Sequence, residues 1–390
     1  MKFKCSRIVI MEALNNVSRA ASQKSTIPAL EGIKLFLNKD VLELTGYDME
    51  LGIQTSIGVE SDDYGEIVVS SRLFCDIIRK MDNDTVTVEI DENMKTTIKG
   101  NAAEYNILAI PADEYPTLPE YDASDSFTLS QSMLKNMINQ TIFAVAADEK
   151  KPILTGELFD IEKGEFNLVA IDGYRMAIRH EKLGNDDRYN FVVKAKALSE
   201  VAKLLNSEEK EEKKENNGDN DTSAENKTNK NSNLVSVNVT KKHIIFSLNG
   251  YTVISRLLEG DFHNYRASLP KSHSTEVVIN TRELLDSLDR CSLLINEKMK
   301  SPVRCLFDNG MLKINCSTAL GKLSDEIKAD ISGNPLEIGF NCRYISEAVR
   351  AVGSDMVKLE LSGGLAPMVI KPVEGDEFIF LVLPVRLKSE

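Results

Sequence analysis

The residues that could act as nucleophiles, acids or metal ligands in this chain do not form a recognised catalytic pattern. The segments Ser132–Lys135 and Ser268–Lys271 match Ser-x-x-Lys, a motif of some acyl-transfer enzymes, but the companion motifs of those enzymes are absent. Phosphate-binding glycine loops are absent as well, and the four histidines lack the spacing of metal ligands. The sequence therefore predicts no catalytic residue, no metal site and no cofactor. An enzyme with an unfamiliar site is the minor alternative.

Asp48 and Asp172 are the carboxylates that come nearest to an acid pair. Each follows a short apolar run, Leu42–Tyr47 in one case and Phe166–Ile171 in the other, and the two runs resemble each other. An aspartate that follows a strand commonly accepts hydrogen bonds from the backbone of a turn. We therefore interpret both aspartates as turn residues rather than as catalytic acids.

A charged pattern that occurs three times gives a stronger signal. In each copy a basic residue is followed four positions later by an acid, and three positions after that by a second base. The three copies are Arg72-Asp76-Arg79, Lys196-Glu200-Lys203 and Arg343-Glu347-Arg350. This spacing places the three side chains on one face of a helix, opposite an apolar stripe that we expect to be buried. The stripe residues are Leu73, Ile77, Ile78 and Met81 in the first copy, Leu198, Val201, Ala202 and Leu205 in the second, and Ile345, Ala348, Val349 and Val352 in the third. A single such face is ordinarily a solvated surface with ion pairs, but its recurrence indicates a shared role.

These helices recur because the chain repeats itself. A helical pattern follows Phe3, Phe127 and Val277, at intervals of 124 residues once a 26-residue insertion is removed. Each repeat has a second helix, over 72–81, 196–205 and 343–352, and alternating apolar runs typical of strands. Repeats of this length are whole domains. We predict an α+β fold of three similar domains, 1–124, 125–271 and 272–390, each with two helices packed on β-sheets.

The insertion, 207–232, has a composition unlike that of the repeats. It holds eight acids, five lysines and one weakly apolar residue, Ala224. Such a segment buries too little apolar surface to offset the entropy lost on ordering, so it is predicted to be a disordered loop of the second domain. A solvated charged helix over Glu208–Glu215 is the alternative.

Positive charge is concentrated in the predicted helices. Segments 6–24, 70–81, 130–147, 194–206, 281–295 and 341–353 hold 14 basic and 7 acidic residues, a net of +7, which leaves −20 for the rest of a chain whose total is −13. A basic helix surface without interleaved aromatic residues suits phosphate contact rather than base reading. Tryptophan is absent and aromatic residues make up only 6%, which argues against stacking on single strands. The expected ligand is duplex nucleic acid, bound without sequence preference.

Composition also sets the expected compartment. No apolar run approaches the length of a membrane helix, and the longest, near Phe378–Leu383, is about a third of the ~20 residues required. The first residues lack the apolar core of a signal peptide. The six cysteines are scattered without a Cys-x-x-Cys pair, which favours a reducing cytoplasm and neither disulfides nor zinc.

Several segments, in this order and spacing, carry a resemblance to a known family. They are Met1–Phe3, Thr26–Leu30, Leu44–Glu50, Ala170–Ala177, Ile338–Asn341 and Leu383–Leu387. With them the chain resembles the bacterial DNA sliding clamp, the beta subunit of DNA polymerase III, over its whole length except 207–232 and a short tail. The resemblance implies a ring-forming head-to-tail homodimer that encircles duplex DNA, slides along it and is not an enzyme. It also implies tethering of the replicative DNA polymerase, the clamp loader, repair polymerases and other proteins with clamp-binding peptides.

The resemblance also assigns site residues. For contact with DNA it implies Lys24 and Arg72, to which charge adds Arg79, Lys150, Lys151, Lys196 and Lys203. The hydrophobic cleft for partner peptides, between the second and third domains, would comprise Leu154, Ile171, Gly173, Tyr174, Arg175, Met176, Met299, Asn341, Tyr344, Leu365, Pro367, Leu383, Pro384, Val385, Arg386 and Leu387. The dimer contact would involve Tyr105 and Ile107 on one side and Leu293, Leu294, Asp325 and Glu326 on the other.

The sequence departs from the family pattern at a few of these places. Tyr174 replaces a common histidine, His263 and Ala267 stand where proline and arginine are frequent, and Lys388–Glu390 extend beyond the usual terminal leucine. Two other interpretations stay open at this point. Leu383 and Val385 are equally consistent with ordinary core packing, and a monomeric adaptor that binds peptides without encircling DNA would also use the cleft.

Overall fold

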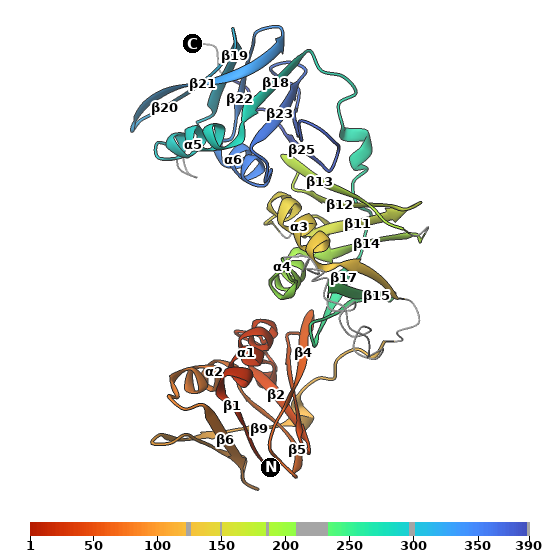
Figure 1. The fold of residues 1–390 in the computed structure, drawn as a ribbon, viewed down its shortest axis with the longest axis vertical. Helices are drawn as coiled ribbons and strands as arrows, with labels where there is room; N and C mark the ends of the chain where they lie inside the picture. The colour runs from red at the N-terminus through yellow and green to blue at the C-terminus, as the bar shows by residue number, and fades with distance from the viewer. Residues whose placement is uncertain (122–125, 149, 185–186, 208–232, 296–300, 388–390) are drawn as a thin grey trace, which may run out of the picture. The chain divides into compact units, whose positions relative to one another are not determined.

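The computed structural model describes residues 1–121, 126–148, 150–184, 187–207, 233–295 and 301–387 (Figure 1). They form two compact units, which we call unit one (1–135 with 197–257) and unit two (136–196 with 258–390), so residues of the second repeat contribute to both. Three sequence-based predictions fall outside the described residues: the disordered loop 207–232 except for Ser207, the cleft residue Met299 and the tail Lys388–Glu390.

Unit one contains two antiparallel sheets. The smaller has the order β1 (Lys2–Ser6), β6 (Thr85–Ile90), β7 (Lys95–Lys99) and β8 (Glu104–Leu108). The larger runs in the order β10 (Ser126–Ser130), β15 (Leu234–Val239), β16 (His243–Leu248), β17 (Tyr251–Leu258), β4 (Leu51–Gly58), β3 (Val41–Tyr47), β2 (Gly32–Asn38), β5 (Tyr64–Ser70) and β9 (Ile110–Pro111). Strands of the first and second repeats thus share one sheet through the pairing of β17 with β4.

Unit two also contains two antiparallel sheets. One has the order β14 (Tyr189–Lys194), β11 (Gly156–Glu162), β12 (Glu165–Ile171), β13 (Arg175–Lys182), β25 (Phe378–Val382), β24 (Met368–Lys371), β23 (Met356–Leu361), β18 (Thr275–Asn280) and the end of β21 (Gly321–Gly333). The other has the order β22 (Leu336–Phe340), β19 (Val303–Asp308), β20 (Met311–Thr318) and the start of β21. The pairing of β13 with β25 joins strands of the second and third repeats.

The helices form where the sequence repeats predict them. The first helices of the repeats are α1 (Arg7–Val17), α3 (Gln131–Thr141) and α5 (Thr281–Ser292), and the second helices are α2 (Ser71–Lys80), α4 (Ala195–Leu204) and α6 (Cys342–Arg350). Short 3-10 helices complete the chain: η1 (Ser18–Ala20), η2 (Pro28–Glu31), η3 (Ala112–Glu114), η4 (Ile142–Ala144), η5 (Pro152–Thr155) and η7 (Tyr265–Ser268). In Figure 1, α5 and α6 lie together against the strands of the third repeat, in the cyan-to-blue part of unit two.

The buried faces of these helices follow the predicted apolar stripes, with one exception. In α4 and α6 every predicted stripe residue is buried, from Leu198 to Leu205 and from Ile345 to Val352. In α2, Leu73 was expected to be buried but is exposed, because Phe74 and Cys75 take the core positions of that turn. The prediction for Leu73 was therefore wrong by one position on the helical wheel.

The six cysteines are free and buried, four of them in the core of the third repeat. Burial raises the pKa of Cys342 to about 11 and that of Cys305 to about 12, which keeps both thiols protonated. These cysteines therefore act as small apolar core residues.

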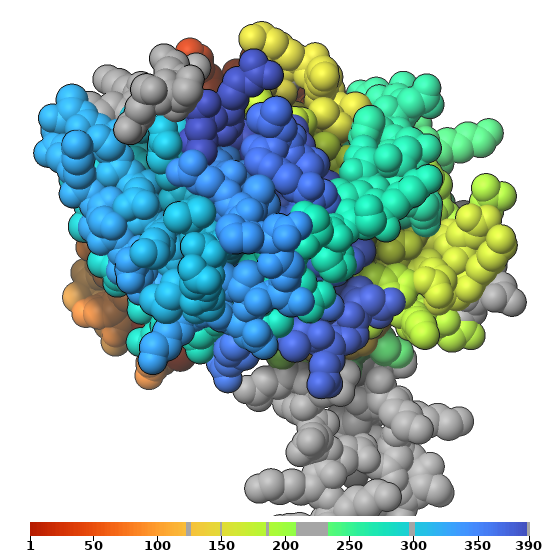
Figure 2. Space-filling view, turned by 90° about the horizontal axis from the view of Figure 1, so that it is seen from above, coloured from red at the N-terminus to blue at the C-terminus, as the bar shows by residue number. Residues whose placement is uncertain are grey.

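Figure 2 shows the third repeat from above as a continuous cyan-to-blue surface.

Candidate functional site

The proposed cleft begins where the C-terminal strand joins unit two. Beyond the last pair of β13 with β25, the Leu383 amide donates to the Tyr174 carbonyl at 2.9 Å, and the Val385 amide donates to the Gly339 carbonyl at 2.8 Å. A side chain at Gly339 would stand 2.5 Å from Leu387 Cδ2, so only glycine admits this path. The segment Leu383–Leu387 is thus held against Tyr174 and Gly339, yet Leu383 and Arg386 are exposed rather than part of a core.

Arg175 is the most strongly held side chain of the cleft. Its side chain is only 5% exposed; Nε donates to Asp172 Oδ2 at 3.0 Å, and Nη1 forms an ion pair with Glu347 of α6. Its guanidinium carbon also lies 4.7 Å from the ring centroid of Tyr344 and 5.4 Å from that of Phe143. Arg175 therefore connects β13 to α6 and is held rigidly among the residues predicted for the cleft.

The two carboxylates around Arg175 have different roles. Asp172 Oδ1 accepts from the backbone amides of Tyr174 at 2.8 Å and of Arg175 at 2.9 Å, which confirms its predicted turn role. Asp48 makes the equivalent turn contacts with Glu50 and Leu51, at 3.0 and 2.7 Å. For Glu347, burial would raise the pKa, but hydrogen bonds from Arg343 and Arg175 outweigh burial and hold it below its usual value.

An apolar surface surrounds this fixed arginine. Ile171 and Met176 are buried in one cluster with Leu158 and Leu381, and Leu154 packs partly buried against it. By contrast, Tyr174 is 60% exposed and Leu365 is 70% exposed. Exposed aromatic and aliphatic side chains beside a rigid charged group are typical of a protein-binding surface.

The remaining cleft residues take less direct parts. Gly173 has a φ of +92°, which suits glycine in the turn before Arg175. Asn341 caps α6, since its Oδ1 accepts from the Arg343 amide at 3.0 Å. Leu365 and Pro367 lie in the connection between β23 and β24, and Pro384 is half-buried in the segment after β25. The structure thus brings together Tyr174, Arg175, Tyr344 and the segment after Val382.

The basic residues proposed for DNA contact are all at the surface. In unit one, Lys24 follows η1, Arg72 and Arg79 lie on α2, and Lys203 lies on α4; in unit two, Lys150 and Lys151 precede η5, and Lys196 begins α4. Arg79 is 2.8 Å from Asp76, Lys203 is 2.8 Å from Glu200, and Lys150 is 3.4 Å from Asp148. In each of these ion pairs the basic side chain is exposed, and an exposed ion pair is weak. The cations are therefore available to a more highly charged partner.

The central acid of the repeated charged pattern has a role that the sequence did not reveal. Glu200 Oε2 lies 2.8 Å from Nε of Arg19 in η1, and Glu347 forms an ion pair with Arg175 of β13. In both cases an acid on the second helix of one repeat pairs with an arginine of the preceding repeat. The expected i,i+4 ion pair within the helix is present at Arg343–Glu347, at 2.9 Å. Glu200 and Glu347 therefore connect successive repeats, whereas Asp76 of the first repeat is exposed and pairs with Arg79 of its own helix.

The positive charge summed over the six helices is spread unevenly among them. Exposed Ile8 and Val9 lie on α1, which carries one base and one acid, and a surface cavity of about 520 Å³ lies beside Ile8, Met11 and Lys203. On α5 acids outnumber bases. Lys135 of α3 donates to the Leu205 carbonyl and to Ser207, both at 2.8 Å. The positive charge therefore belongs mainly to α2, α4 and α6.

The residues proposed for the dimer contact lie at two strand edges. Tyr105 and Ile107 are on β8, which among the described strands pairs only with β7. The first part of β21, Gly321–Lys328, pairs only with β20 in the described chain, and the nearby Leu293 is 80% exposed. The two acids are already engaged: Arg290 and Ser287 donate to Asp325, and Glu326 is 3.1 Å from Lys313. The apolar residues, rather than the acids, are thus the free part of these edges.

Sequence reasoning missed one cluster. His273, Glu276 and Glu360 come together although His273 and Glu360 are 87 positions apart in sequence. The only local signal was His273 three residues before Glu276, which is too short a pattern to indicate a site.

Comparisons with known proteins agree on one family. Residues 1–119, 128–213 and 266–386 match the N-terminal, central and C-terminal domain models of the DNA polymerase III beta subunit. The Beta sliding clamp of Bacillus subtilis is 31% identical over 399 aligned positions, covering 99% of this chain and all of that protein. A putative DNA polymerase III beta subunit from Eubacterium rectale is 33% identical, with a TM-score of 0.88 and coverage of 99% and 100%. The sliding clamp of Pseudomonas aeruginosa bound to griselimycin is 27% identical, with a TM-score of 0.87 and the same coverage. Among the helices described, none has the length and apolar character needed to cross a lipid bilayer.

Proposed function

The chain belongs to the family of bacterial DNA polymerase III beta subunits, the sliding clamps, and we propose that two copies close head to tail into a ring around duplex DNA. As a sliding clamp it is a processivity factor of DNA replication rather than an enzyme. Three domains, 1–124, 125–271 and 272–390, would give six in the ring. The ring holds DNA by enclosing it, so affinity for any one sequence is not required.

The observation that carries the ring is the pair of open strand edges. The edge of β8 lies in the first repeat and that of β21 in the third, and each has exposed apolar side chains beside it, Tyr105 on one and Leu293 near the other. An unpaired strand edge favours pairing with another chain. Pairing the first repeat of one copy with the third repeat of the other satisfies both edges and closes the assembly by a twofold axis.

The DNA-facing surface is assigned to the second helices. Arg72 and Arg79 on α2, Lys196 and Lys203 on α4, together with Lys24, Lys150 and Lys151, would contact phosphates as the ring slides. Contacts to phosphate carry no sequence information and are weakened by salt. A loose, sequence-independent interaction suits a protein that has to move along its substrate.

The cleft around Arg175 is assigned to partner peptides. Exposed Tyr174, Leu365 and Leu383 offer apolar contact, while the half-buried polar groups around Arg175 stay fixed. A short extended peptide with a glutamine and bulky apolar residues would dock there, as in other peptide-recognition grooves. The replicative DNA polymerase, the clamp loader and repair polymerases would present such peptides. We propose that the protein acts in the cytoplasm.

The proposal is tested by mass and by processivity. Sedimentation at micromolar concentration is expected to give a dimer of the 43.4 kDa chain, and primer extension by the replicative polymerase of the same organism is expected to lengthen when the chain is loaded. A persistent monomer that still binds partner peptides would favour a monomeric adaptor instead.

A further inference from the structure

Two glutamates of unit two face each other across neighbouring strands. Glu276 of β18 and Glu360 of β23 are direct partners in the antiparallel register, so their side chains leave the same face of the sheet. Like charges directly opposite each other on a sheet are destabilising unless a cation lies between them. The pair therefore requires compensation by a positive group.

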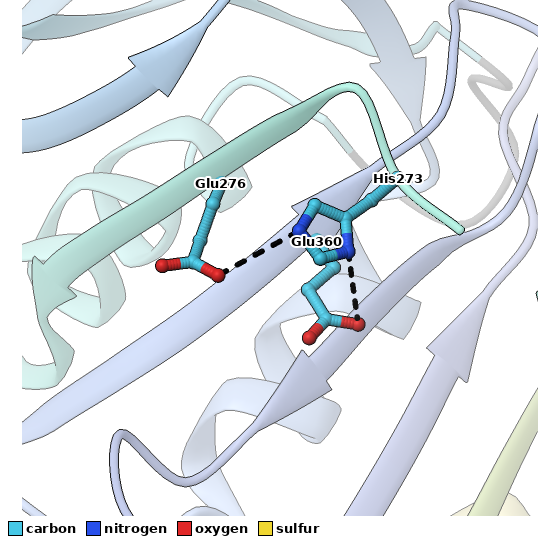
Figure 3. Close-up of side chains that lie close together, drawn as sticks. All are labelled: His273, Glu276 and Glu360. Carbon is cyan, nitrogen blue, oxygen red and sulfur yellow. Dashed lines mark ion pairs between the residues drawn. The ribbon is translucent and has the colours of Figure 1, made fainter. Parts of the chain in front are cut away.

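His273 lies between these two carboxylates. Figure 3 shows its imidazole with one ring nitrogen toward each acid: Nε2 is 3.7 Å from Glu276 Oε2, and Nδ1 is 3.7 Å from Glu360 Oε2. Both separations exceed a hydrogen bond. An imidazole binds one ion through one nitrogen, so an ion would use either Nε2 or Nδ1 of His273. Each 3.7 Å separation, taken singly, is close to the ~3.4 Å between two ligands bound at ~2.1 Å to one tetrahedral ion. One ligand atom from each of the three residues fits within 4.8 Å of the others.

The positive charge already present compensates only one of the acids. Lys371 Nζ is 2.8 Å from Glu360 Oε2, the same oxygen that faces His273 Nδ1, so an ion bound through this oxygen would compete with Lys371. Within the described part of the chain, Glu276 has no lysine or arginine at ion-pair distance. His273 and Glu276 are partly exposed, so an ion would reach the cluster from solvent.

We propose that His273, Glu276 and Glu360 bind a divalent transition-metal ion such as Zn²⁺, with water completing its coordination. An imidazole nitrogen with two carboxylate oxygens is a donor set that zinc accepts, whereas calcium and magnesium prefer oxygen alone. The spacing of the histidines does not predict this site; the fold creates it by pairing β18 with β23.

The location suggests what the ion would do. His273 lies near the end of the segment 259–274, which leads into β18. Tyr265 of this segment is buried in the apolar cluster that contains Ile171 and Met176, and Leu269 packs against that cluster. An ion shared between His273 and the two strands would fasten the end of that segment to the sheet of the third repeat. Binding is therefore expected to stabilise the folded chain against heat.

The test uses the full-length chain without a histidine tag, with Zn²⁺ alone in calorimetry and Co²⁺ alone in absorption spectroscopy. We expect one ion per chain, a rise in Tm on adding zinc, and a tetrahedral Co²⁺ spectrum without the charge-transfer band of a thiolate. His273→Ala and Glu276→Gln should each weaken binding at least tenfold. His180→Ala is the matched control, because His180 stands 3.2 Å from a single carboxylate, Glu165, and should bind as the parent chain does.

A further variant separates metal binding from a simple ion-pair cluster. Lys371→Gln removes a competing cation from Glu360 and should tighten zinc binding, whereas at an ordinary ion-pair cluster it would produce no zinc affinity at all. Absence of zinc binding up to millimolar concentration, or binding that survives His273→Ala, would overturn the proposal. A thiolate band with Co²⁺ would do so too, because it would place the ion on the cysteines.

Discussion

The ring of Tyr174 stacks on the ring of Tyr344, with centroids 5.7 Å apart and planes inclined by 25°. The Arg175 guanidinium also lies over the ring of Tyr344. Tyr174, in the turn before β13, and Tyr344, on α6, are thus in direct aromatic contact. Tyr174 is the residue at which the sequence departs from the histidine common in sliding clamps. This contact places two stacked aromatic rings among the residues proposed to bind partner peptides.

Replacing Tyr174 by alanine should weaken peptide binding while leaving the fold intact. The side chain is 60% exposed, so its loss removes docking surface rather than core. Stacked aromatic contacts contribute about 1 kcal/mol beyond their area, and we expect at least a fivefold loss of affinity. Fluorescence anisotropy with a labelled peptide that contains glutamine and bulky apolar residues measures this affinity. Tyr64→Ala is the control, because Tyr64 is exposed at the start of β5. Equal binding by both variants would show that Tyr174 is not part of the peptide site.

Arg175→Ala should destabilise unit two strongly. The substitution leaves Asp172 and Glu347 without their buried cation, and breaking a buried ion pair in this way costs about 3 kcal/mol. Urea unfolding would show the loss, and Glu347→Gln in the Arg175→Ala background should restore part of it. If Arg175→Ala unfolds at the same urea concentration as the parent chain, the fastening role of Arg175 is wrong.

Reversing the charge of α2 should lower affinity for DNA and its dependence on salt. Arg72→Glu with Arg79→Glu removes two candidate phosphate contacts, and each lost contact reduces the slope of log K against log salt by about 1. Binding to a short duplex at several salt concentrations measures the slope. Lys95→Glu, exposed on β7, is the matched control. An unchanged slope in the double variant would mean that α2 does not face DNA.

The buried carboxyl of Glu157 should make stability depend on pH. It is 0% exposed, and burial raises its pKa to about 8 although Thr141 Oγ1 lies 2.8 Å from Oε2. The unfolded chain loses this proton near pH 4.5. The folded chain therefore binds more protons between these values, and its stability falls as pH rises from 4.5 to 8, after which this contribution is constant.

Glu157→Gln removes this dependence. Relative to the parent chain, the variant should gain up to ~1.4 kcal/mol of unfolding free energy for each pH unit through that window. Urea unfolding at pH 5.5, 7 and 8.5 measures the difference, with Glu92→Gln, on an exposed turn, as the control. A difference that does not change with pH would show that Glu157 is ionised in the folded chain.

Leu293→Asp should shift the dimer toward monomer. The side chain is 80% exposed within one chain, so the monomer should fold normally, while a charge in the proposed contact opposes pairing. Sedimentation over a range of concentrations should show at least a tenfold weaker dimer. Val41→Asp, exposed on β3, provides the comparison; if it weakens the dimer equally, the contact does not lie at Leu293.

The repeats and helices were predictable because each is set by local periodicity. The apolar stripes of α4 and α6 are buried as the sequence predicts, and the turn roles of Asp48 and Asp172 follow from their place after a strand. The shift at Leu73 shows the limit of that reasoning, since neighbouring positions on a helix compete for the core and packing decides between them.

The contacts between elements could not be read in the same way. The Arg19–Glu200 and Arg175–Glu347 pairs depend on which elements of successive repeats pack together, and from the charge pattern alone both acids are interpreted as surface residues. The cluster of His273, Glu276 and Glu360 depends on the register of β18 with β23. Long-range pairing of this kind leaves no local pattern.

The most direct test of the ring is retention on DNA of different topology. The chain, loaded onto a nicked circular plasmid by its clamp loader, should stay bound through gel filtration in salt that abolishes simple electrostatic binding. Cutting the plasmid once should then release it, because a ring slides off a free end. Release at the same rate from circular and linear DNA would contradict enclosure of the duplex and leave only surface binding.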